Sequence, residues 1–103
     1  MFIGKERVFE EVFIETTTSA NAKTTSIIGI DSLTDLVDKV VYLKAGNANT
    51  GATTLNVNDL GALSVKKYSK EGLVDLEEND IVISQMCLLT YDGIQFILLN
   101  PTV

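Results

Sequence analysis

The feature that most constrains this chain is a series of short apolar runs, separated by turn-forming residues, that fills everything from residue 39 onwards. The segment 54–58 alternates strictly between polar and apolar residues, so Leu55 and Val57 are expected on one face of a strand. Helical periodicity is missing from this part of the chain. Further strands are predicted at 25–30, 39–44, 63–66, 81–83, 86–91 and 95–99, and loops or turns at 16–24, 31–38 and 73–80.

Turn residues add detail to this pattern. Asp92-Gly93 predicts a hairpin with a type I′ turn, because glycine tolerates a positive φ. Asp31 or Ser32 is expected to cap a single helical turn. Short strands joined by turns are typical of an all-β fold, here an antiparallel β-sandwich of jelly-roll-like form. The expected core residues are Tyr42, Leu55, Val57, Leu60, Leu88, Phe96 and Leu98, and Cys87 is expected to be a buried apolar side chain.

The length of 103 residues corresponds to one domain, predicted to be a β-sandwich domain over 16–103 preceded by an N-terminal arm over 1–15. The arm fits a short helix or an entering strand. It is rich in large apolar residues, which is unusual for a free tail. One hypothesis is that the arm attaches the domain to a neighbouring protein, and the other is that it covers the domain itself. The candidate attachment residues are Phe2, Ile3, Phe9, Val12 and Phe13.

The charge of the chain argues against nucleic-acid and membrane partners. It has 14 acidic against 8 basic residues, with a net charge of −6. Phosphate groups are bound by clustered Lys and Arg, and the largest basic group here is Lys66, Lys67 and Lys70. An anionic lipid surface is disfavoured for the same reason. The N-terminus turns charged after four residues, which is not a secretory signal.

The residue types also argue against an enzyme and against a bound cofactor or metal. There is no His and one Cys, which removes Ser–His and Cys–His pairs and the common zinc sites. The acidic residues of 71–80 lack the central glycine of a calcium loop, so we interpret them as a solvated acidic turn. A sugar site is a weaker hypothesis, because amide and aromatic groups together bind sugars. Its candidates are Asn47, Asn49 and Thr50, with Tyr42 or Tyr91.

Two motifs in order resemble a known module. The first is Asn49-Thr50-Gly51-Ala52-Thr53-Thr54-Leu55-Asn56-Val57-Asn58 followed by Leu60-Gly61-Ala62. The second is Tyr91-Asp92-Gly93 followed by Gln95-Phe96 and Leu98-Leu99-Asn100. Together they resemble a small β module of phage tail fibres, receptor-binding proteins and head fibres. The resemblance covers 40–100, more weakly 25–39, and not the arm. The sequence departs from the module at Asp59 and Ile94, and also in 68–71.

The resemblance implies a non-enzymatic structural protein of a bacteriophage virion, assembled in the host cytoplasm. It implies a symmetric homotrimer that contacts other virion proteins, either decorating the capsid or forming the base of a head fibre. The alternative that it implies is a tail-fibre or baseplate module that binds host surface glycan. No catalytic residue is carried over from the family.

Overall fold

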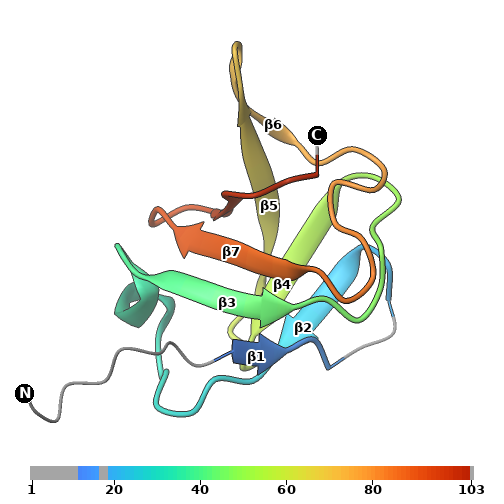
Figure 1. Cartoon of the computed structure of the whole chain (residues 1–103). Coiled ribbons are helices and arrows are strands. Elements are labelled where there is room, and N and C mark those ends of the chain that lie inside the picture. Colours follow the sequence, from blue (N-terminus) through green and yellow to red (C-terminus); the bar gives the residue numbers. More distant parts are fainter. Residues whose placement is uncertain (1–11, 17–18, 103) are drawn as a thin grey trace, which may run out of the picture.

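The computed structural model describes residues 12–16 and 19–102 (Figure 1). Within these ranges the chain forms eight strands and one 3₁₀ helix, η1 (Leu33–Leu36), and no α-helix. The prediction of an all-β fold is confirmed. The strands are β1 (Val12–Ile14), β2 (Ala22–Thr25), β3 (Val40–Lys44), β4 (Thr53–Val57), β5 (Ala62–Ser69), β6 (Gly72–Asp75), β7 (Met86–Tyr91) and β8 (Phe96–Leu98).

All eight strands belong to one mixed sheet, in the order β1-β3-β7-β8-β5-β4-β2, with β6 paired to β5 outside this path. Three of the pairs are parallel: β1 with β3, β2 with β4, and β5 with β8. The predicted antiparallel sandwich is therefore wrong in its architecture. Alternation and turn residues predict most of the strands, but parallel pairs between segments far apart along the chain depend on the tertiary fold.

The two ends of the sheet come together, so that it is nearly closed into a barrel (Figure 1). The Thr16 amide, just after β1, donates to the Thr24 carbonyl of β2 at 2.8 Å. The Thr25 hydroxyl donates to the Ile14 carbonyl at 2.9 Å. We call this junction of β1 and β2 the seam. Closure satisfies polar groups that an open sheet edge would leave to solvent.

The barrel interior is filled by alternate residues of β3, β4 and β7 and by residues of β5 and β8. Leu55 and Val57 lie inside as expected, and so do Cys87, Phe96 and Leu98. The other three core predictions are wrong. Tyr42 and Leu88 are half-buried on the outer face, opposite each other in the register, while their neighbours in sequence point inward. Leu60 is 37% exposed in the turn after β4. The core residues from β3 and β7 are Val41, Leu43, Cys87, Leu89 and Tyr91.

Four segments differ from the sequence-based prediction. β2 lies within a predicted loop, and residues 27–30 form a loop where a strand was expected. The strand β6 occupies the first residues of the segment 73–80, which was predicted to be an acidic turn. Residues 81–83 are not a strand, because the amide and carbonyl groups of Ile81 bind Asn49 rather than a neighbouring strand. Three of these differences involve partners far along the chain, namely β4, Asn58 and Asn49, whereas β6 pairs with the preceding strand β5 across a tight turn.

The predicted hairpin joins β7 to β8 as antiparallel neighbours, which confirms that prediction. The turn is not type I′, because Gly93 has a φ of +101° while Asp92 is not left-handed. Instead, Asp92 Oδ1 accepts hydrogen bonds from the amides of Ile94 and Gln95. These bonds, those from Gln95 first, lower the pKa of the Asp92 carboxyl. At η1 the predicted cap is Ser32, in a capping box with Asp35.

A buried ion pair crosses the seam. Lys23 of β2 lies 3.2 Å from Glu15, and their side chains are 2% and 0% exposed. Lys23 Nζ also donates to the Asn47 carbonyl at 2.8 Å, and the same Glu15 oxygen accepts from the Gly46 amide at 2.8 Å. The pair therefore joins β1, β2 and the loop after β3. Buried charges are tolerated only when paired and hydrogen-bonded in this way.

We expect Glu15→Gln to lower the free energy of unfolding by about 3–5 kcal/mol, because it leaves the buried Lys23 cation uncompensated while keeping the shape of the side chain. The matched control is Lys66→Met, which removes the solvent-exposed ion pair with Asp75. That change should cost less than about 1 kcal/mol. Urea unfolding followed by circular dichroism measures both. Equal losses in the two variants would mean that the seam does not depend on the Lys23–Glu15 pair.

Candidate functional site

A hollow of about 380 Å³ lies beside the two-stranded ribbon of β5 and β6, which projects from the barrel (Figure 1). The ribbon is held by four register pairs, from Lys66–Asp75 to Ser69–Gly72. The hollow is open and its lining mixes polar and apolar groups. The lining residues are Lys67, Tyr68, Ser69, Glu71, Val74, Asp75 and Glu77.

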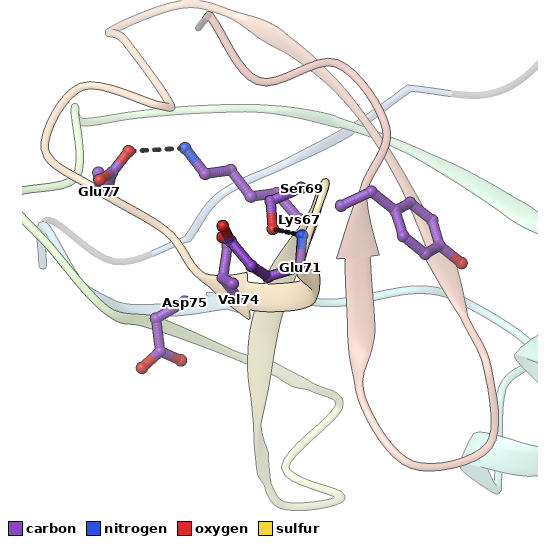
Figure 2. Close-up of a pocket in the computed structure, with 7 residues that line it drawn as sticks. Lys67, Ser69, Glu71, Val74, Asp75 and Glu77 are labelled. Carbon is purple, nitrogen blue, oxygen red and sulfur yellow. Dashed lines mark hydrogen bonds and ion pairs between the residues drawn. The ribbon is translucent and has the colours of Figure 1, made fainter.

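Lys67 is the charged centre of this region. It lies on the same side of β5 as the core residue Val65, and it is itself buried. Its Nζ lies 2.9 Å from Glu77 Oε1 and 2.8 Å from Asp80 Oδ2. Figure 2 shows the lysine extending toward Glu77 from the other side of the hollow. Hydrogen bonds to Asp80 and then Glu77 raise the pKa of Lys67, so the amine is held as a cation.

Asp80 is fully buried and connects three segments. Its Oδ2 accepts from the Glu77 amide at 2.7 Å as well as from Lys67. Its carbonyl accepts from the Thr102 amide, which attaches the C-terminal segment. Its other carboxylate oxygen, Oδ1, is buried without a hydrogen-bond partner. The predicted solvated acidic turn is therefore wrong for Asp80.

Sequence reasoning missed the pairing of Lys67 with Asp80. The available signal was alternation within β5, since Leu63, Val65 and Lys67 follow a period of two. A lysine at a core-facing position needs an anionic partner, because an unpaired buried charge is very costly. The nearest acidic segment in the sequence is 71–80. This reasoning would have marked the cluster, although not which of the acids is buried.

The proposed glycan residues occupy a different place. Asn49 is fully buried, its Nδ2 donates to the carbonyls of Gly51 and Glu77, and its Oδ1 accepts from the Ile81 amide. Asn49 therefore clamps two loops together and presents no group to a ligand. Thr50 is exposed but bonded to Asn21 through both its amide and its hydroxyl. Asn47 is half-buried, and its carbonyl accepts from Lys23.

The two tyrosines do not complete a sugar site with these loop residues. Tyr91 is buried, and its ring packs against Phe96 with the ring centroids 5.4 Å apart. It therefore belongs to the core. Tyr42 lies on the outer face of β3. The glycan hypothesis for this loop rests on Asn47 and Thr50.

A second candidate surface is the outer side of β1, β3 and β7, which we call the outer face. It is largely apolar although it lies outside the barrel. Of the predicted attachment residues, Val12 lies on this face, whereas Phe13 points inward and packs against the core. Phe2, Ile3 and Phe9 lie outside the described residues. The outer face comprises the apolar residues Val12, Ile14, Val40, Tyr42, Met86 and Leu88 and the polar residues Lys44 and Thr90, with Leu99 beside Leu88.

Metal-binding groups, membrane-spanning helices and a reactive thiol can be judged only in the part of the chain that the structure describes. Among residues 12–16 and 19–102, no three His, Cys, Asp or Glu side chains are arranged to hold a metal ion. None of the helices in these ranges has the length and apolar character needed to cross a bilayer. Burial raises the pKa of the Cys87 thiol to about 11.

Comparisons with known proteins add no assignment: no family model, curated protein or solved structure matches the chain. The resemblance to phage fibre modules therefore stays a prediction from the two sequence motifs. The outer face, the hollow and the buried polar groups are the features of the described residues that bear on function.

We expect Asn49→Ala to lower the free energy of unfolding by about 1–3 kcal/mol, because it leaves the buried Ile81 amide without a partner. It also removes one of the two hydrogen bonds to the Glu77 carbonyl, which keeps its bond from the Asp80 amide. Asn47→Ala is the matched control in the same loop, since Asn47 bonds Lys23 through its backbone carbonyl, which the substitution keeps. Its cost should be within about 0.5 kcal/mol. Thermal unfolding measures both. Equal thermal stability of Asn49→Ala and Asn47→Ala would contradict the structural role of the Asn49 side chain.

Cys87 should react with an alkylating reagent only when the barrel opens. The thiolate is the reactive species, and a pKa of about 11 leaves the thiol protonated at neutral pH. We therefore expect slow labelling at pH 7.5 in buffer and rapid labelling in 8 M urea, followed by intact mass. Labelling in buffer as fast as in urea would contradict the buried position of Cys87.

Proposed function

We propose that this chain is a non-enzymatic structural protein of a bacteriophage virion, working as a homotrimer that decorates the capsid or forms the base of a head fibre. The observation that carries the proposal is the apolar outer face of β1, β3 and β7. In a sheet with one face in water, the residues that point to the water are normally polar, and they alternate along each strand with apolar residues that point to the core. Here the outward positions of three adjacent strands are largely apolar, which is the signature of a surface that another protein covers.

The exposure of individual side chains supports this interpretation. Ile14 is 64% exposed, and Met86, two strands away across Lys44, is 45% exposed. Val40, further along β3, is 43% exposed. Contact with a neighbouring subunit would bury these groups, and each fully buried aliphatic side chain contributes roughly 1.5–3 kcal/mol.

A trimer is the assembly that this proposal adopts. Closed symmetric homo-oligomers are the rule among soluble assemblies, and the phage modules that the motifs resemble are commonly trimeric. A chain of about 100 residues also buries a modest share of its unfolded surface, so contacts between subunits add useful burial. The small size, the absence of His and the single buried Cys are in keeping with a structural role.

A receptor-binding module that holds host glycan is the alternative, and one observation favours it. The hollow beside the β5–β6 ribbon combines the exposed Tyr68 ring with the polar side chains of Ser69 and Glu71. Aromatic and polar groups together are what sugar sites use. Binding on a glycan array that is lost in Tyr68→Ala would support this alternative over the decoration role.

We expect the full-length protein to sediment as a trimer, with three times the chain mass of 11.2 kDa. Ile14→Glu should shift it to a monomer at tens of micromolar, because it places a charge in the outer face. Ile28→Glu is the matched control: Ile28 is 98% exposed in the loop after β2, so the trimer should persist. A wild-type monomer, or a trimer unaffected by Ile14→Glu, would contradict the outer face as the subunit interface.

A further inference from the structure

We propose that Lys67 and Asp80 form an intramolecular isopeptide bond, with Glu77 transferring protons. The three side chains are the groups that such a condensation needs: an amine, a buried carboxyl and a neighbouring acid. Lys67 Nζ lies 2.8 Å from Asp80 Oδ2 and 2.9 Å from Glu77 Oε1. The bond would link the base of the β5–β6 ribbon to the segment 77–81. Asn49 and Thr102 also bind this segment through hydrogen bonds to Ile81 and Asp80.

Burial is the first argument for the reaction. The Asp80 side chain is fully buried and that of Lys67 is 9% exposed, so an ion pair is kept largely away from water. Desolvation makes buried ion pairs expensive even when they are well aligned. Condensation replaces the two charges by one neutral amide, and therefore removes that cost.

The unpartnered oxygen of Asp80 is a second and independent observation. Oδ1 is buried and accepts no hydrogen bond, whereas Oδ2 accepts from both Lys67 and the Glu77 amide. A carboxylate oxygen left in this state is much costlier than a neutral carbonyl oxygen. In the isopeptide product Oδ1 is the amide carbonyl oxygen, and Oδ2 is the oxygen that leaves.

The step balances without an oxidant or a further reactant. One proton of the Lys67 ammonium passes to Asp80 Oδ2 along their contact, which gives a neutral amine beside a neutral acid. Nζ then attacks Cγ, and the new N–C bond forms as a second proton moves from Nζ through Glu77 to Oδ2. The Cγ–Oδ2 bond breaks, one water leaves and Glu77 is again a carboxylate. Glu77 is 75% exposed, so the water has a path to solvent.

Positioning provides the rate enhancement. The strand and the turn hold amine and carboxyl together, and fixed partners of this kind reach effective concentrations of about 10⁵–10⁸ M. The contact is also specific. The neighbouring pair Lys66–Asp75 has a separation of 2.7 Å, but Asp75 is 60% exposed. Water stabilises its charges, so this pair serves as an internal control that should stay uncondensed.

Intact mass spectrometry of the denatured full chain, after prolonged incubation at neutral pH, tests the proposal. We expect a mass lower by one water, and a branched peptide joining Lys67 to Asp80 after proteolysis, with Lys66 and Asp75 unlinked. Lys67→Arg keeps the positive charge and should restore the full mass. Glu77→Gln should slow the loss of water at least tenfold. Circular dichroism checks that both variants fold.

The controls also separate the proposal from a trivial loss of water. Asp92-Gly93 can form a cyclic imide, which has the same mass change but persists in Lys67→Arg and opens with hydroxylamine. A full, unchanged mass in the wild type after incubation would overturn the proposal. So would a water loss that maps away from Lys67 and Asp80.

Discussion

The fold depends on the buried ion pair between Lys23 and Glu15, because this pair closes the sheet. β1 and β2 are three and four residues long, and the hydrogen bonds between them at the seam are few. Short strands contribute little by themselves. The pair holds both strands and the loop after β3 by contacts that water does not screen. With the seam closed, Leu55, Phe96 and Leu98 can be fully enclosed.

Side-chain amides fix the loops that connect this barrel. Asn49 joins the loops at 49–51 and 77–81, and Asn58 binds both the amide and the carbonyl of Ile27. Asn100 does the same for β7, accepting from the Leu88 amide and donating to the Met86 carbonyl. An amide offers the same donor and acceptor as a peptide group, so it replaces backbone partners where a strand has ended. Asn49, Asn58 and Asn100, which belong to the two sequence motifs, therefore have structural roles.

The sequence was informative where burial follows a local period and uninformative where it depends on distant partners. Alternation correctly placed Leu55, Val57 and Phe96 inside. It placed Tyr42 and Leu88 wrongly, because a period of two shows which residues share a face but not which face is enclosed. β2 was missed because Lys23 is buried only through Glu15, eight residues earlier. The Lys67–Asp80 pair joins residues thirteen positions apart through a turn that resembled a solvated acidic segment.

In the proposed function, the barrel has a fully packed interior, while its apolar outer face is buried only when a neighbouring protein covers it. A cryo-electron-microscopy reconstruction of the virion proposed to contain this chain tests this most directly. We expect three copies of the chain around a threefold axis on the capsid or head fibre, with β1, β3 and β7 of each copy buried against its neighbours. A particle that lacks the chain, or one in which the outer faces of its copies lie open to solvent, would contradict it.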